Sequence, residues 1–160
     1  MRIFFHAFSS HISESVKQAL QEDFIKADRL FLILTVVQWL LVSTATALPT
    51  GTYLFGFIAG GIVTLLVGLA YLFFRGTVVC RMVVGASLML FSAIMIQQGL
   101  GRIEMHFHVF VSMSFLPRYR DPIPVLTAAT VIALHHLIGN YCQQAGWTVA
   151  GMPVSIFDYG

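Results

Sequence analysis

Two short histidine-rich stretches hold the residues of this sequence best suited to chemistry. Glu104, His106 and His108 lie in the run Glu-Met-His-Phe-His, and His135 and His136 stand together further along the chain. Imidazole and carboxylate groups ligate transition ions such as zinc, iron and copper, and two imidazoles can also bind haem iron from both sides. The two stretches therefore predict a site for a transition metal or for haem.

Helical spacing indicates which of these side chains can meet. Glu104 and His108 are four residues apart and share one helix face, whereas His106 points elsewhere. His136 and Asn140 form the matching pair on another helix, so we expect Glu104, His108 and His136 to converge. The remaining candidates, which would ligate the metal or orient its ligands, are His106, His135, Gln97 and Gln98.

The same spacing allows two other interpretations. The polar groups could hydrogen-bond across a helical bundle as a structural network, or they could conduct protons or ions. The sequence contains no nucleophile elbow, no phosphate-binding glycine loop, no HExxH motif and no paired carboxylates. We therefore expect no catalytic activity of its own.

Composition indicates the elements that must position these residues. The 160 residues are 58% hydrophobic and only 10% charged, and the mean hydropathy is +0.83. A soluble core of this size cannot hide so much apolar surface, whereas lipid can solvate it. The sequence predicts an all-α, polytopic transmembrane bundle, and its small net charge of +2 gives no support to nucleic-acid binding.

About five apolar runs are separated by turn-forming or charged residues. The fourth is short for a full crossing, so it must pack among other helices, thin the bilayer or carry its polar start into the hydrophobic layer. An amphipathic cytoplasmic or interfacial segment, 1–29, is expected before a sensor bundle, 30–142, and an outward-facing tail, 143–160. The expected spans are 30–48, 53–74, 82–98, 103–116 and 124–142.

Basic residues predict the orientation, because cytoplasmic loops of membrane proteins are enriched in Lys and Arg. With a cytoplasmic N-terminus three basic clusters fall on one side, and only Arg102 falls on the other. This arrangement places Cys80 and Cys142 at opposite membrane faces, so they are not expected to pair. The three clusters are Lys17, Lys26 and Arg29, then Arg75 and Arg81, then Arg118 and Arg120.

The first two spans contain residues suited to helix packing. Gln38 and Trp39 are expected to pack and to hydrogen-bond between helices. Small residues recur every four positions in the second span, which allows a neighbouring backbone to approach closely or the chain to dimerise. This stripe consists of Gly56, Gly60, Thr64 and Gly68.

Several of these motifs together resemble a known family. The chain is similar, over roughly residues 25–160, to the N-terminal membrane-sensor region of bacterial methyl-accepting chemotaxis proteins, hybrid sensor histidine kinases and diguanylate cyclases. The residues that carry the resemblance are the run 101–110 with its ExHxH pattern, Tyr119-Arg120-Asp121, the run 132–137 with His135-His136, Asp28-Arg29-Leu30-Phe31 and Gln38-Trp39.

The resemblance implies a multi-pass sensory input module of a bacterial inner membrane, acting in chemotaxis or other signal transduction as a homodimer or with a signalling partner. The family's histidine pattern carries onto Glu104, His106, His108 and His136. Pro117 and Pro122 depart from the pattern, and the return span and output domain of the relatives are not expected before Gly160. A small metal or proton transporter, or a membrane metalloenzyme using the same cluster, is the alternative.

Overall fold

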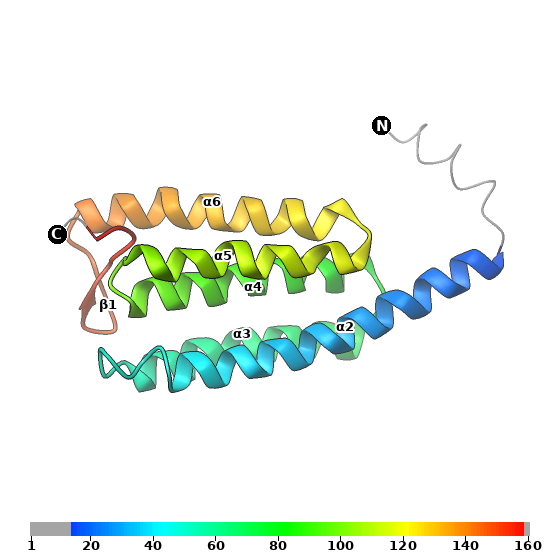
Figure 1. Ribbon diagram of the computed structural model, residues 1–160, viewed down its shortest axis with the longest axis horizontal. Coiled ribbons are helices and arrows are strands. Elements are labelled where there is room, and N and C mark those ends of the chain that lie inside the picture. The colour runs from blue at the N-terminus through cyan, green and yellow to red at the C-terminus, as the bar shows by residue number, and fades with distance from the viewer. Residues whose placement is uncertain (1–13, 159–160) are drawn as a thin grey trace.

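Helices make up most of the computed structural model, which describes residues 14–158 (Figure 1). The all-α prediction is confirmed. Residues 1–13 of the expected segment 1–29 lie outside the described residues, as do residues 159–160 of the expected tail 143–160. The elements are α2 (Glu14–Ser43), α3 (Tyr53–Phe74), α4 (Val78–Gln98), α5 (Ile103–Phe115), the 3-10 helix η1 (Leu116–Tyr119), α6 (Pro122–Gln144), β1 (Thr148–Val149) and β2 (Met152–Pro153).

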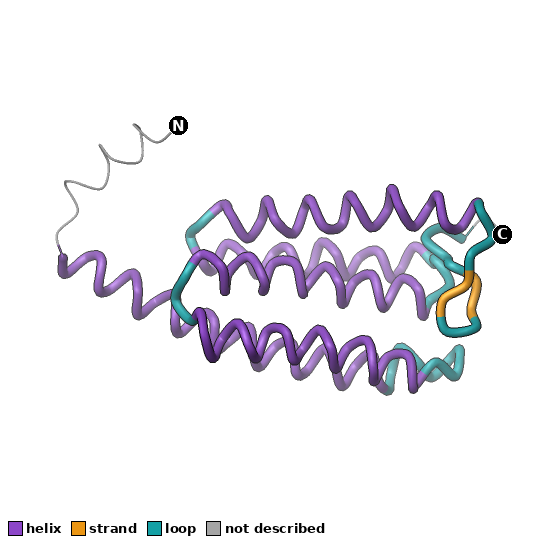
Figure 2. The backbone as a smooth tube through the Cα atoms, turned by 180° about the vertical axis from the view of Figure 1, so that it is seen from behind, coloured by secondary structure: helices purple, strands orange, loops and turns teal. Residues whose placement is uncertain are grey.

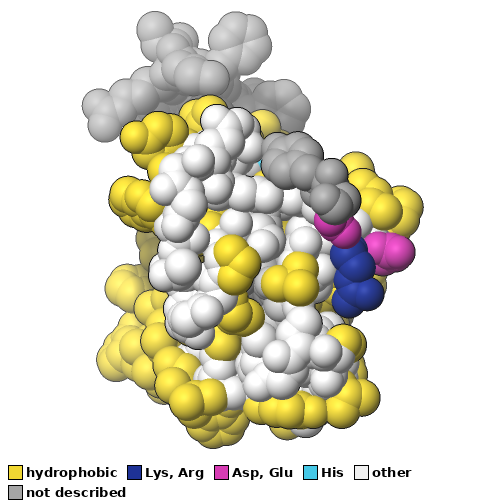
Figure 3. All heavy atoms as spheres, turned by 90° about the vertical axis from the view of Figure 1, so that its left-hand side faces the viewer, with side chains coloured by type: hydrophobic (Ala, Val, Ile, Leu, Met, Phe, Trp, Pro, Cys, Tyr) yellow, Lys and Arg dark blue, Asp and Glu magenta, His cyan; other side chains and the backbone are white. Residues whose placement is uncertain are grey.

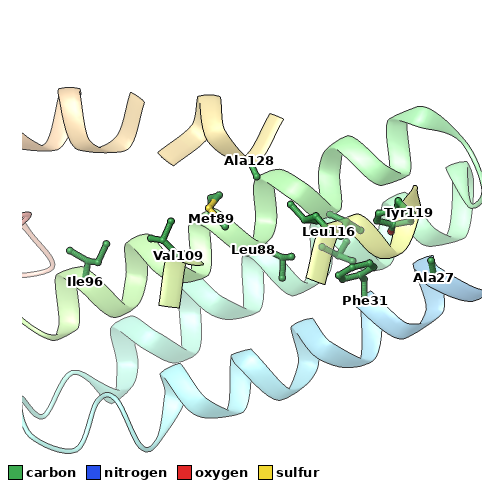
Figure 4. Close-up of a cluster of buried hydrophobic side chains, with 11 residues drawn as sticks. Ala27, Phe31, Leu88, Met89, Ile96, Val109, Leu116, Tyr119 and Ala128 are labelled. Atoms are coloured by element: carbon green, nitrogen blue, oxygen red, sulfur yellow. The ribbon is translucent and has the colours of Figure 1, made fainter. Parts of the chain in front are cut away.

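Consecutive helices run up and down the bundle, and α4 lies at its centre (Figures 1 and 2). α4 packs against α2, α3, α5 and α6, and 67% of its most apolar 18-residue window is buried, against 11% of that of α6. Buried side chains follow α4 along the bundle, with Ile96 near one end and Tyr119 near the other (Figure 4). The start of α2 projects beyond the bundle, whereas the antiparallel pair of β1 and β2 closes the opposite end.

Three helices, α3, α4 and α6, are long and apolar enough to cross a membrane. Viewed from the end that carries the β-hairpin, hydrophobic side chains surround the bundle and charged ones gather at one edge (Figure 3). Length and composition do not qualify the other two expected spans as crossings. α5 has only 13 residues, and in α2 the apolar part between Arg29 and the helix end at Ser43 is short.

Several helix ends differ from the expected spans. The first expected span joins the amphipathic segment in one continuous helix, α2. This helix ends five residues before the expected end, because threonine side chains donate hydrogen bonds to its last carbonyl groups. Thr44 Oγ1 donates to Leu40 O at 2.6 Å, and Thr46 Oγ1 donates to Leu41 O at 3.3 Å. α6 begins at Pro122, two residues early, because Asp121 caps it by accepting from the backbone N–H of Ile123 at 2.9 Å.

Glycines permit the closest helix contacts, as expected for the small-residue stripe. A Cβ on Gly56 would collide with the carbonyl of Val42 on α2, whereas one on Gly68 would meet open space. The sequence did not single out Gly85 on α4, where a Cβ would collide with the carbonyl of Pro124 on α6. Trp39 confirms its expected role, because its Nε1 donates to Phe57 O across the α2–α3 contact at 2.9 Å.

Candidate functional site

His106 of α5 and His136 of α6 face each other across the helix contact near the β-hairpin end. Their ring centroids are 5.4 Å apart. Nδ1 of His106 lies 3.1 Å from the carbonyl of Arg102, and Nδ1 of His136 lies 2.8 Å from that of Ile132. A carbonyl only accepts hydrogen bonds, so both Nδ1 atoms carry a proton, and in the neutral form of each ring Nε2 keeps a free lone pair.

His135 completes a cluster of three imidazoles. Its ring meets that of His136 edge-on, with centroids 5.5 Å apart. The Nε2 atoms of His135 and His106 are buried and have no hydrogen-bond partner within residues 14–158. An unpaired buried polar atom costs about 1–3 kcal/mol, so two of them in one cluster require an explanation. A bound cation that accepts both lone pairs would remove this cost.

The tail crosses directly over this histidine cluster. The ring of Phe157 lies parallel to that of His106, with centroids 5.8 Å apart, and is equally distant from His136. Gln143 of α6 holds the tail in place: its Oε1 accepts from the backbone N–H groups of Ile156 and Phe157 at 2.8 and 3.1 Å, and its Nε2 donates to Phe157 O at 2.7 Å. We call residues 153–158 the strap.

His108 lies apart from this cluster, which corrects the expected convergence of Glu104, His108 and His136. Its Nδ1 is 2.8 Å from Ser92 Oγ on α4, and its Nε2 is 3.2 Å from Gln38 Nε2 on α2. The physical reason is the rotation of α5, which turns His108 toward α4 and α2 and therefore turns His106 toward α6. Glu104 is exposed and makes no hydrogen bond or ion pair with any residue between 14 and 158.

The other polar candidates hold the surrounding loops. Gln97 binds the strap, because its Nε2 donates to Pro153 O at 2.8 Å and its Oε1 accepts from Ser155 N at 3.1 Å. Gln98 ties the end of α2, donating to Val42 O at 2.9 Å. Asn140 accepts from Gln144 Nε2 at 3.4 Å. These hydrogen bonds place the two glutamines of α4 in a supporting role around the cluster and not on its imidazoles.

No three His, Cys, Asp or Glu side chains among the described residues surround one ready metal position. The ring centroids of His106 and His135 nevertheless lie 5.4 and 5.5 Å from that of His136. His135 also borders a groove of about 740 Å³ between α3, α4 and α6. Its ring is therefore not packed on every side.

A second polar cluster lies at the opposite end of the bundle, where the motifs Asp28-Arg29 and Tyr119-Arg120-Asp121 meet. Asp28 is fully buried and accepts from Gly76 N at 2.6 Å and from the hydroxyl of Tyr119 at 2.7 Å. Burial, and then the Asp28 carboxylate, raise the pKa of Tyr119, so that its hydroxyl stays protonated and donates. Arg81 donates from Nε to Asp121 Oδ2 at 2.9 Å.

We call Asp28, Gly76, Arg81, Tyr119 and Asp121 the inner network. It joins α2, the α3–α4 turn, η1 and the start of α6, and none of the unpartnered buried side-chain atoms within 14–158 belongs to it. The sequence did contain a signal for this network, which was not used: Asp28 stands just before an apolar run, and an acidic residue that becomes buried there needs polar partners. Arg81, expected only to mark the cytoplasmic side, is buried in this network.

Comparison with protein-family models, with curated proteins and with solved structures finds no match for this chain in any of the three.

Proposed function

We propose that this chain is a membrane-embedded sensory input module of a bacterial signal-transduction protein, with a transition metal or metal cofactor as the ligand of its histidine cluster. The observation that carries the proposal is the pair of buried, unpartnered Nε2 atoms on His106 and His135. Ionisable groups at membrane depth are costly and are usually retained for function. The inner network of the same bundle differs from the histidine cluster, because all of its buried polar groups have partners.

The proposal includes five crossings of the inner membrane with a cytoplasmic N-terminus. In this proposal α2 and α5 cross the membrane together with α3, α4 and α6. The three basic clusters then lie on the same side of the membrane. At 1.5 Å per residue α5 is about 20 Å long, shorter than a hydrocarbon core of about 30 Å. The start of α5, with His106, therefore lies within the outer half of the lipid layer.

A continuous helix supports a signalling role. α2 runs unbroken for 30 residues, and two of its residues contact the two polar regions. Gln38 lies beside His108 on α5, two residues from His106, and Asp28 anchors the inner network. These positions are ten residues apart, or about 15 Å along the helix. A shift of α5 at the cluster would reach the projecting start of α2, where a second copy or a signalling protein would read it.

Hydrogen–deuterium exchange of the protein in lipid nanodiscs tests this proposal. Zinc, copper, iron and haem are added separately, and exchange is followed in residues 23–31 and 116–123. We expect one of these ligands to change exchange in both segments, and the response to disappear in His136→Ala but to persist in Leu137→Ala, an exposed neighbour on α6.

Liposome flux measurements separate the sensor from its rival. A sensor moves no ions, so reconstituted protein should leave metal and proton gradients intact while its inner end responds to the ligand. Flux or turnover by the purified chain would favour the transporter or metalloenzyme. An inner end that responds to none of the added ligands would contradict the sensory proposal.

A further inference from the structure

We infer that His106, His135 and His136 bind one small divalent transition ion of the zinc or copper type through their Nε2 atoms, and that Glu104 and His108 are not ligands. This inference rests on the proposed function and makes its ligand specific. It reduces five candidate ligands to three, and it makes ligands of His106 and His135, which sequence spacing had left open as ligands or as residues that orient the ligands.

The hydrogen bonds of Nδ1 prepare two of the three rings for metal binding. Metal-ligating histidines commonly donate their second ring N–H to a carbonyl or carboxylate, which fixes the ring orientation and the tautomer. His106 and His136 both do this with backbone carbonyls of their own helices. Nε2 of His106 is buried without a hydrogen-bond partner among the described residues, and the His136 ring makes its one hydrogen bond there through Nδ1.

His135 supplies the third nitrogen by a small movement. Its ring already meets that of His136 edge-on, and its Nε2 loses no hydrogen bond when the ring turns, because it makes none within the described chain. The ring also borders an open groove, so it is not packed on every side. The ion draws the third imidazole in, which explains why no preformed group of three is present in residues 14–158.

The spacing of the rings favours a small ion over haem. Metal–nitrogen distances of about 2.0–2.1 Å place two nitrogens on opposite sides of an iron about 4 Å apart, and the ring centroids about 6 Å apart or more. The centroids of His106 and His136 are closer, at 5.4 Å, and Phe157 lies against both rings. No flat macrocycle fits between them, whereas a tetrahedral ion bound by three imidazoles leaves one open position.

The strap controls access to this position. Phe157 covers the rings of His106 and His136, and the three hydrogen bonds of Gln143 fix its backbone. Ile156 fills the notch beside Gly139, where a Cβ would collide with its side chain. Entry of the ion requires the strap to move, so the strap sets the rates of binding and release.

Zinc binding to the full chain in nanodiscs, measured by equilibrium dialysis and by X-ray absorption at the zinc edge, tests the site. We expect one zinc per chain with three imidazole ligands. Removal of even an outer partner of a metal ligand weakens binding by about 10–100-fold, so His106→Ala, His135→Ala and His136→Ala should each weaken it at least about tenfold. Glu104→Gln, on the same helix as His106, should change it less than about twofold.

The outcomes separate this inference from the proposed function. Zinc bound by fewer than three imidazoles, or lost in Glu104→Gln, would overturn the assigned ligand set. His135→Leu keeps the test valid if an alanine variant misfolds, since it only replaces a nitrogen that has no partner. If another ligand changes exchange in residues 23–31 and 116–123 and zinc does not bind, the metal site is rejected and the sensory proposal is kept. If zinc binds but exchange in these two segments does not change, the metal site is kept and the sensory proposal is rejected.

Discussion

Asp28 near one end of the bundle and His135 near the other are both polar residues in buried surroundings, yet their partners differ. Asp28 accepts two hydrogen bonds, from Gly76 and Tyr119, and the network around it is complete. Nε2 of His135, like that of His106, has none among the described residues. A complete network stabilises the protein, whereas an incomplete one costs free energy until a ligand binds. The inner network is therefore structural, and the histidine cluster is the candidate binding site.

The largest expected effect comes from breaking the ion pair of the inner network. Arg81→Met leaves Asp121 without its partner, and removal of one member of a buried pair costs about 3–5 kcal/mol. Arg75→Met is the matched control, because Arg75 is exposed and should change stability by less than about 0.5 kcal/mol. Denaturant unfolding in detergent measures both. Equal effects of the two substitutions would show that the Arg81 pair is not structural.

A smaller loss is expected from Tyr119→Phe. The phenylalanine keeps the stacking with Phe31, whose ring centroid is 4.9 Å from that of Tyr119, but removes the donor to the Asp28 carboxylate. A hydrogen bond to a charged group contributes about 1.5–3 kcal/mol. Tyr71→Phe on α3 controls for the general effect of losing a hydroxyl. A Tyr119→Phe variant as stable as Tyr71→Phe would refute the claimed role of this bond.

Two histidine substitutions compare a paired imidazole with an unpaired one. His108→Leu removes one hydrogen-bond partner each from Ser92 and Gln38 and should cost about 1–3 kcal/mol, whereas metal-free His135→Leu should lose nothing or gain up to about 1 kcal/mol. Thermal unfolding with a chelator present measures the difference. The reverse order of stabilities would mean that His135 has a structural partner in the membrane.

The smallest change in stability is expected from Gln143→Ala. The substitution removes the three hydrogen bonds that hold the backbone of Ile156 and Phe157, but the buried core along α4 stays intact. Global stability should change by less than about 1 kcal/mol, while hydrogen exchange in residues 155–158 and zinc release become faster. Unchanged exchange in the strap would contradict its proposed attachment through Gln143.

Composition and periodicity predicted the elements well, because they depend on local properties. The run 53–74 matches α3 at both ends, and each of the five apolar runs forms a helix over most of its length. The misplaced ends are those decided by single side chains, as where Thr44 and Thr46 end α2 early and Asp121 starts α6 early. Local hydropathy does not record these hydrogen bonds.

The site was predicted in part. The sequence identified the histidines but paired His108 with His136, since helical spacing gives the relative direction of side chains and not the rotation of the whole helix. That rotation follows from how α5 packs on α4, which depends on residues distant in sequence. Ser112, one turn after His108, was the available signal, because it lies on the same face and contacts the imidazole at 3.3 Å. The inner network and the strap depend entirely on such distant contacts.

Anomalous diffraction at the zinc edge, from crystals of the full chain grown with zinc, tests the contrast between the two ends most directly. The account predicts a single peak at the β-hairpin end of the bundle, about 2.0–2.1 Å from Nε2 of His106, His135 and His136, with the inner network unoccupied. A peak between Glu104 and His108, or no peak at all at saturating zinc, would contradict it.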